Sequence, residues 1–267
     1  MVPSVFPAPS PSDSGLRLES LARICMSLSR RPLPDAGWGA AGRDSFARFS
    51  SALFRAMSGK VASGDDLACR CRLAVSLHAL MRETDCVADA RRYADWEALA
   101  ARVLDDCEAS ASGLLPPCAC LLLLDYYYAW TSAPDDDPLW QLLEETFGSW
   151  SASYSPSAGW KDLALREALE RVRVLNRYSY MYLDHRYDRL ATEAFRRYTR
   201  LLLEDGRRVD PEEAGLLYDL SQEGNACPDD LRLREKLCGI IRRATLYAPA
   251  DSDEFWYGLS YQFEFLS

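Results

Sequence analysis

Apolar side chains recur every three or four positions along residues 187–203, which is the spacing of one face of an α-helix. The stripe consists of Tyr187, Leu190, Ala191, Ala194, Phe195, Tyr198, Leu201 and Leu202. The opposite face is polar and mostly basic, and it holds Arg189, Glu193, Arg196, Arg197 and Arg200. The pattern predicts an amphipathic helix whose arginine-rich side faces water.

The same period appears on both sides of this helix, in segments that form pairs joined by polar connections. Residues 161–183 pair with 187–203 through Asp184 and His185, and so short a connection makes the two helices antiparallel. The other predicted pairs are 16–29 with 44–57, 66–82 with 92–107, 114–130 with 138–150, and 211–222 with 229–246. In chain order, the four pairs that begin near residues 66, 114, 161 and 211 start about 47 to 50 residues apart. This spacing is typical of helical-hairpin arrays.

The sequence therefore predicts an all-α fold of consecutive antiparallel helical hairpins, arranged as an α-solenoid-like array. An α/α toroid and a compact bundle are the alternatives. We expect a single all-α domain over residues 16–267, preceded by a disordered Pro/Ser-rich tail over residues 1–15. The aromatic segment 255–266 is either a last short helix or a strand-like end piece. Small and polar residues indicate linkers at 59–64, 109–113 and 151–159.

One predicted hairpin carries small and aromatic residues at Ser179, Tyr182, Ala191 and Phe195. In this spacing the hairpin resembles a degenerate tetratricopeptide-type repeat over about 30 residues. It departs from that family at two positions, because Leu175 stands where the family has a tryptophan and Tyr198 where it has an alanine. The resemblance implies a helical-hairpin architecture and no particular activity.

Charge, the length of the apolar runs and cysteine content limit the classes of partner and the location that we expect for this protein. The net charge of −9 disfavours a nucleic-acid binder, although a local basic face remains an alternative. The longest apolar run, residues 114–124, is too short to span a bilayer, so no membrane partner is expected. An odd set of nine cysteines without a secretion signal favours free thiols in a soluble cytoplasmic protein.

Asp125 stands inside a predicted helix that is otherwise apolar all round. A buried carboxylate is costly unless it is paired or hydrogen-bonded. A structural acid, held by tyrosine hydroxyls or by an arginine from the next hairpin, is the simpler interpretation, and a ligand-binding or catalytic carboxylate is the alternative. Asp135, Asp136 and Asp137 precede the predicted helix at Pro138 and fit the role of N-terminal caps.

Two Cys-x-Cys pairs, at Cys69 and Cys71 and at Cys118 and Cys120, raise the question of a metal site. Residues two apart on a helix point about 200° apart, so we expect thiols in the core or at helix starts. Of the two histidines, His78 fits a core imidazole and His185 a solvated turn. Since recognisable phosphate-loop, nucleophile and metal-binding motifs are missing from the sequence, no cofactor or catalytic residue is predicted.

The leading hypothesis is a scaffold that binds a protein or peptide through tyrosine, tryptophan and arginine side chains. The candidate binding residues are Asp125, Tyr127, Trp130, Arg173, Arg177, Tyr180, Asp184, His185 and Arg186. An α/α-toroid enzyme or small-molecule or sugar-binding protein is the alternative, with a site formed by Asp135, Trp160, Asp184, His185 and Glu223. Nucleic-acid binding through the basic face of residues 161–208 is the third hypothesis.

Overall fold

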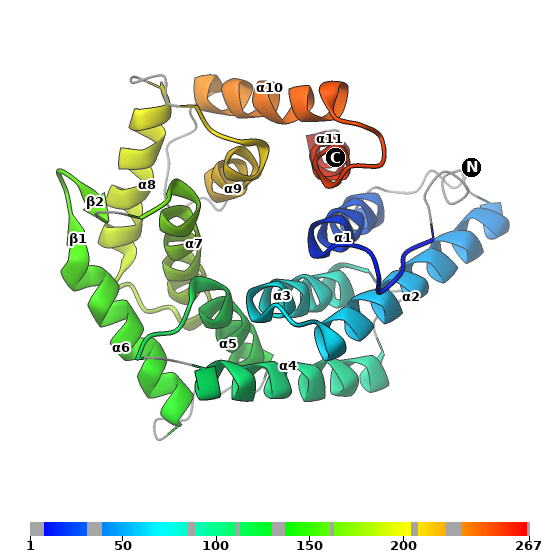
Figure 1. Ribbon diagram of the computed structural model, residues 1–267, viewed down its shortest axis with the longest axis horizontal. Helices are drawn as coiled ribbons and strands as arrows, with labels where there is room; N and C mark the ends of the chain where they lie inside the picture. The colour runs from blue at the N-terminus through cyan, green and yellow to red at the C-terminus, as the bar shows by residue number, and fades with distance from the viewer. Residues whose placement is uncertain are drawn as a thin grey trace. The chain divides into compact units, whose positions relative to one another are not determined.

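The computed structural model describes residues 8–30, 39–84, 89–110, 113–129, 137–160, 163–203, 208–222 and 231–265. Nearly all of these residues are helical, which confirms the all-α fold class (Figure 1). The helices are α1 (Gly15–Arg30), α2 (Gly39–Ser63), α3 (Leu67–Glu83), α4 (Ala90–Ser110), α5 (Pro117–Ala129), α6 (Pro138–Ser153), α7 (Leu165–Tyr182), α8 (Asp188–Leu203), α9 (Pro211–Gln222), α10 (Leu231–Tyr247) and α11 (Asp253–Phe265). Each helix of the five predicted pairs is present, with shifts of a few residues at its ends.

The structure decides between two alternatives at the C-terminal segment and corrects two of the expected linkers. The linker expected at 59–64 is helical up to Ser63, where α2 ends. The aromatic C-terminal segment is the helix α11, because Trp256 and Tyr261 are both buried on the face that packs against α1. The expected linker at 151–159 contains a small antiparallel hairpin of β1 (Tyr154–Ser155) and β2 (Gly159–Trp160). The turn between these strands is closed by Ala158 N–H donating to the Ser155 carbonyl at 3.2 Å.

The chain divides into two compact units. The first unit comprises residues 1–107 together with 247–267, and the second comprises residues 108–246. The first unit is therefore built from both ends of the chain, and the second from one continuous segment. The predicted single domain and the predicted repeat both stay predictions.

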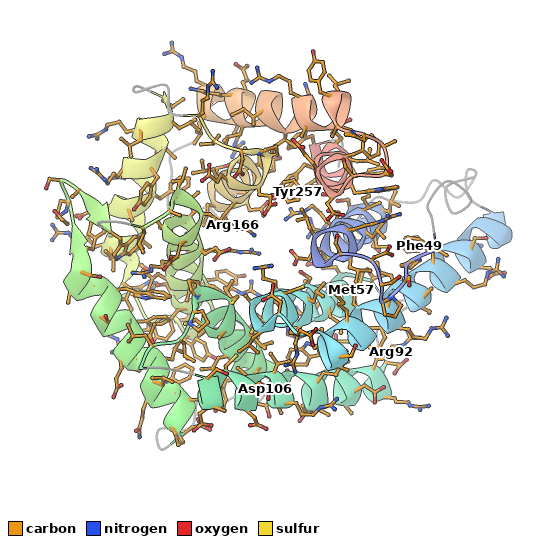
Figure 2. All side chains as sticks on the ribbon, in the orientation of Figure 1. Phe49, Met57, Arg92, Asp106, Arg166 and Tyr257 are labelled. Atoms are coloured by element: carbon orange, nitrogen blue, oxygen red, sulfur yellow. The ribbon has the colours of Figure 1, made fainter. Side chains whose placement is uncertain are left out.

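The first unit is assembled around α1, which packs against α2, α3 and α11. Arg23 on α1 forms an ion pair with Glu264 of α11 at 2.7 Å, and its guanidinium lies over the Tyr261 ring. α4 is attached to α3 by Trp96, whose indole N–H donates to the Ala74 carbonyl at 2.8 Å. Arg70 of α3 also pairs with Asp106 of α4, which is labelled in Figure 2.

His78 and most of the described thiols of the first unit lie in its core. His78 is 4% exposed and stacks on Trp96, which confirms its interpretation as a core imidazole. Cys71 is buried 3.5 Å from Cys107, sulfur to sulfur, and Cys69 is half-buried near the start of α3. In the ranges given above, His, Cys, Asp and Glu side chains form no group of three that could hold a metal ion.

The second unit is centred on α7, which packs against α5, α8 and α9 (Figure 1). Leu165, Leu169, Val172 and Leu175 form its buried stripe, at helical spacing. α5 is buried almost all round, as its apolar composition predicts. Arg166 extends from α7 and pairs with Glu212 at the start of α9 (Figure 2). No helix among the described segments is long and apolar enough to cross a membrane.

Candidate binding surfaces

Asp125 and Arg177 join α5 to α7 through an ion pair. The Arg177 Nη2 donates to Asp125 Oδ1 at 3.1 Å, and the Asp125 residue is only 3% exposed. Nearby, the Tyr182 hydroxyl donates to the Leu124 carbonyl at 3.2 Å. Burial and then the charge of Asp125 raise the Tyr182 pKa above its usual range. Asp125 is thus held by an arginine of the next hairpin, as the structural interpretation expects, and its role in ligand binding stays a prediction.

Tyr127 belongs to the aromatic core between α5 and α6. It is 7% exposed, and its ring meets Trp140 edge-on with the ring centroids 5.7 Å apart. Burial, followed by a hydrogen bond to Asp137, raises the pKa of its hydroxyl. Asp137 also caps α6, because its Oδ1 accepts from Leu139 N–H at 2.8 Å. The structure thus places Tyr127 inside the fold and not on an exposed binding face, while Trp130 lies outside the described residues.

Arg186 holds the turn between α7 and α8 together. Its Nε donates to Asp184 at 2.7 Å, and its two terminal nitrogens donate to Glu144 on α6. The buried Tyr178 hydroxyl donates to the Asp184 carboxylate at 2.8 Å. Burial acts to raise the Asp184 pKa, but hydrogen bonds from Arg186 and Tyr178 outweigh it and lower that pKa. His185 is exposed and lies 2.7 Å from Asp188. Asp184, His185 and Arg186 are therefore engaged in contacts within the fold, with one another or with Glu144, Tyr178 and Asp188.

Three large apolar side chains are exposed in the last turns of α5 and α7. They are Tyr128 at 47%, Tyr180 at 69% and Leu183 at 79% exposure, and we refer to them as the helix-end surface. Tyr128 and Tyr180 each follow a member of the Asp125–Arg177 pair by three residues, so both lie one helical turn beyond it. Arg173 is half-buried one turn earlier on α7.

Leu183 ends α7 in a left-handed backbone conformation, with φ of 52° and ψ of 30°. This conformation is common after the last helical turn, but glycine usually occupies it because a Cβ atom is strained there. Leu183 is the one non-glycine residue with positive φ among those described. Its exposed side chain gains little from packing within the chain to offset this strain.

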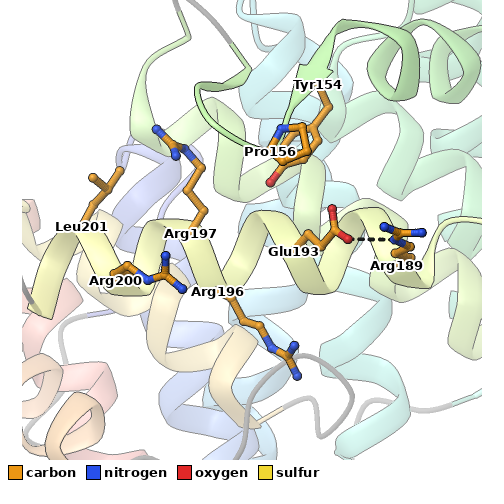
Figure 3. Close-up of a pocket in the computed structure, with 8 residues that line it drawn as sticks. All are labelled: Tyr154, Pro156, Arg189, Glu193, Arg196, Arg197, Arg200 and Leu201. Carbon is orange, nitrogen blue, oxygen red and sulfur yellow. Dashed lines mark hydrogen bonds and ion pairs between the residues drawn. The ribbon is translucent and has the colours of Figure 1, made fainter.

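A second surface is a pocket of about 320 Å³ between the β1–β2 hairpin and α8, which we call the arginine pocket (Figure 3). In Figure 3 the hairpin residues Tyr154 and Pro156 lie over α8, and Arg197 extends from α8 on the hairpin side. Its described lining residues are Tyr154, Pro156, Arg189, Glu193, Arg196, Arg197, Arg200 and Leu201. Four arginines therefore face a single carboxylate.

The β1–β2 hairpin is fixed onto the second unit by Trp160. The Trp160 indole N–H donates to the Trp150 carbonyl at 2.7 Å, and its ring meets Tyr154 at a centroid distance of 5.2 Å. Gly159 lies close against α8 with φ of 71°, so that an added Cβ would come within 2.9 Å of the Tyr198 hydroxyl. Trp160 is only 4% exposed, and it is a structural anchor that offers no open face to a sugar ring.

Charge inside the arginine pocket is unevenly compensated. Glu193 pairs with Arg189 at 2.8 Å. Arg196 and Arg197 form no ion pair within the described segments, and the buried Nε of Arg197 has no hydrogen-bond acceptor there. Burial raises the pKa of Tyr154 above its usual value, so its hydroxyl stays protonated at neutral pH. The pocket thus offers two kinds of hydrogen-bond donor, the positively charged guanidinium groups and the neutral Tyr154 hydroxyl.

One wall of this pocket is predicted from the sequence, but the hairpin that covers it is not. The polar stripe from Arg189 to Arg200 was predicted as a solvated face, and it does lie on the outer side of α8. The small and polar residues of 151–159 predict a linker, and the structure corrects this to the end of α6 followed by the β1–β2 hairpin. Tyr154 and Trp160 flanking Pro156 and Gly159 are the signal that could have found it, since aromatics on either side of turn residues favour a hairpin.

The alternative small-molecule set does not come together in the described part of the second unit. Trp160 is buried, Asp184 is held by Arg186 and Tyr178, and His185 pairs with Asp188. Asp135 and Glu223 lie outside the described residues. Comparison with known proteins finds no matching family model, curated protein or solved structure. The tetratricopeptide resemblance and the functional hypotheses consequently stay predictions.

Proposed function

We propose that this chain is a helical interaction scaffold that binds a protein or peptide partner, with the helix-end surface as the contact. The observation that carries the proposal is the exposure of Tyr128 in the last turn of α5 and of Tyr180 and Leu183 at the end of α7, since these two helices pack against each other. Large apolar groups gathered on an otherwise polar surface are typical of partner-binding sites. The Asp125–Arg177 pair makes these two helix ends a firm platform.

The composition of this surface also favours a protein partner over a small ligand. Tyrosine and arginine dominate the energetics of protein interfaces, because each supplies a large contact area and a polar group. Arg173 and Arg177 border the exposed tyrosines, and burying Tyr180 and Leu183 gains roughly 25 cal/mol for each Å² of apolar surface removed from water. The expected partner therefore presents an apolar side chain with a hydrogen-bond acceptor beside it.

Crosslinking followed by affinity capture from cell lysate tests the proposal. The native chain is expected to recover a stoichiometric protein partner, and the double variant Tyr180→Ala with Leu183→Gly is expected to lose it. Removing a central interface tyrosine costs about 2 kcal/mol or more, or roughly a thirtyfold loss of affinity.

Tyr247→Ala is the matched control, because Tyr247 is 83% exposed at the end of α10 and is not one of the three residues of the helix-end surface. It should recover the partner as the native chain does. Equal recovery by the double variant, or no stoichiometric partner after crosslinking, would count against the proposal.

A further inference from the structure

We propose that the arginine pocket binds a phosphate monoester. This site shares no residue with the helix-end surface, and the inference does not depend on the proposed function. The ligand class follows from the positive charge of the pocket, its donors and its size, which are considered in turn.

The positive charge of the pocket differs from that of the neighbouring helices because it is not fully compensated. Four arginines on α7 and in the turn that follows it are held by carboxylates: Arg166 by Glu170 and Glu212, Arg171 by Glu167, Arg177 by Asp125, and Arg186 by Glu144 and Asp184. Arg196 and Arg197 have no such partner among the described residues. A bound anion would supply the missing charge.

The donors of the pocket suit a phosphate group better than a carboxylate. A phosphate monoester carries close to two negative charges at neutral pH, which matches two uncompensated guanidinium groups. Guanidinium groups hold phosphate oxygens through paired N–H donors. The buried Nε of Arg197 is a donor without an acceptor, and the protonated Tyr154 hydroxyl is a further donor. Arg196 and Arg200 are exposed on flexible stems at the rim.

The size and walls of the pocket indicate that the phosphate is carried on a small organic body. A volume of about 320 Å³ is at the lower end of the range for small-molecule sites and exceeds what a bare phosphate ion needs. Tyr154 and Pro156 form an apolar wall beside the guanidinium groups (Figure 3). A ring or short chain attached to the phosphate would lie against this wall.

The surroundings of the pocket disfavour an extended nucleic-acid strand. A strand needs a continuous basic track, because each phosphate carries one charge and the contacts follow the backbone. Within the described residues, the track is interrupted by Glu193 at one end of the pocket and by the compensated arginines of α7. One concentrated dianion fits this arrangement better than a row of monoanions.

Isothermal titration calorimetry on the full chain tests this site with phenyl phosphate, O-phosphoserine and inorganic phosphate as ligands. Benzoate has the same ring with a carboxylate and separates phosphate recognition from general anion binding. A short single-stranded RNA without a terminal phosphate tests the strand alternative. Phenyl phosphate is expected to bind more tightly than both benzoate and inorganic phosphate, and the comparison with O-phosphoserine shows whether the ring contributes.

Two substitutions locate the binding. Arg196→Met and Arg197→Met should each weaken phenyl phosphate binding about tenfold to a hundredfold, the usual effect of losing a charge-assisted hydrogen bond. Arg243→Met is the control, since Arg243 is exposed on α10 of the same unit and outside the pocket lining. Arg196 is exposed, so Arg196→Met keeps the fold even where Arg197→Met disturbs the hairpin, and melting curves of each variant check this.

Any one of four results would overturn the proposal. One is benzoate binding as tightly as phenyl phosphate. Another is unchanged phenyl phosphate affinity in a folded Arg196→Met variant, or no measurable phosphate binding by the native chain. The last is RNA binding that is tighter than phenyl phosphate and falls steeply with salt, which would assign the surface to a nucleic acid.

Discussion

At the residue scale, the charged groups of the second unit are used mainly to fasten helices to one another. Asp125 is the clearest case, since a carboxylate that is 3% exposed is tolerated only because Arg177 compensates its charge. Arg186 does the same for the α7–α8 turn through Glu144 and Asp184. The better candidates for a functional role are therefore residues whose features the fold does not explain. Leu183, with an exposed side chain on a left-handed backbone, is the clearest of these.

Replacing Leu183 with glycine is expected to stabilise the chain. The left-handed conformation costs a residue with a Cβ roughly 1 to 2 kcal/mol, and glycine avoids that cost. Glycine also raises the conformational entropy of the unfolded chain, which lowers the free energy of unfolding by up to about 1 kcal/mol. The net change should raise the free energy of unfolding by up to about 1 kcal/mol, because little burial is lost at 79% exposure. Chemical denaturation measures it.

Leu246→Gly provides the contrast for this measurement. Leu246 is 72% exposed but lies in the helical backbone of α10, where glycine costs about 0.5 to 1 kcal/mol. The two substitutions should therefore have opposite signs. A destabilising Leu183→Gly would mean that the Leu183 side chain contributes to the fold, and would weaken its assignment to a partner surface.

At the element scale, helices could be predicted from the sequence and the small hairpin could not. Long apolar stripes such as Leu165 to Leu175 identify a helix by themselves, because every turn repeats the signal. β1 and β2 have two residues each, too few to show any alternation, and their position depends on the contact of Trp160 with α6. The same limit applies to the candidate site, since the arginine stripe was visible but its cover was not.

The candidate binding residues predicted from the sequence divide into exposed and buried side chains, and the division has a physical reason. Arg173 and Tyr180 lie on the outer stripe of α7, where periodicity predicts exposure, whereas Tyr127 lies in a helix that is apolar on every face. Periodicity cannot say which face of such a helix is buried. Pairing partners such as Glu144 for Arg186 come from another helix and leave no signal in the local sequence.

Substitution of Gly159 tests whether the hairpin is held tightly on α8. Gly159→Ala is expected to lower the free energy of unfolding by about 1 to 3 kcal/mol, because its φ of 71° is strained for alanine and the new Cβ would lie 2.9 Å from the Tyr198 hydroxyl. The affinity of the arginine pocket for phenyl phosphate should fall in the same variant.

Gly148→Ala is the matched control within α6, where an added Cβ meets no described atom within 4 Å. It should raise the free energy of unfolding by about 0.5 to 1 kcal/mol, as alanine does inside a helix. If Gly159→Ala proved as harmless as Gly148→Ala, the hairpin would not be a fixed wall and the pocket would lose its cover.

At the scale of the whole molecule, the segments that pack into one unit are not always consecutive in the chain. The second unit is continuous over residues 108–246, while the first needs both residues 1–107 and the C-terminal segment. α11 covers α1 with Trp256 and Tyr261, and Arg23 pairs with Glu264 across the same contact. During synthesis, the first unit therefore lacks one of its helices until residues 253–265 are made.

This difference predicts unequal behaviour of two fragments. Residues 108–246 alone should fold and melt cooperatively, because their contacts lie within one segment. Residues 1–107 alone should give helical but uncooperative melting, since they lack α11 and leave the face of α1 beneath it exposed. Adding a peptide of residues 247–267 should restore a cooperative transition, with a midpoint that rises with peptide concentration.

Circular dichroism melting curves of the two fragments, with and without the peptide, measure this. The same peptide carrying Tyr261→Ala is the control, because Tyr261 is 1% exposed, and losing a buried aromatic side chain typically costs about 3 to 5 kcal/mol. A sharp melt of residues 1–107 without any peptide would show that α11 is dispensable. Equal rescue by the Tyr261→Ala peptide would show that the aromatic face of α11 does not hold the first unit together.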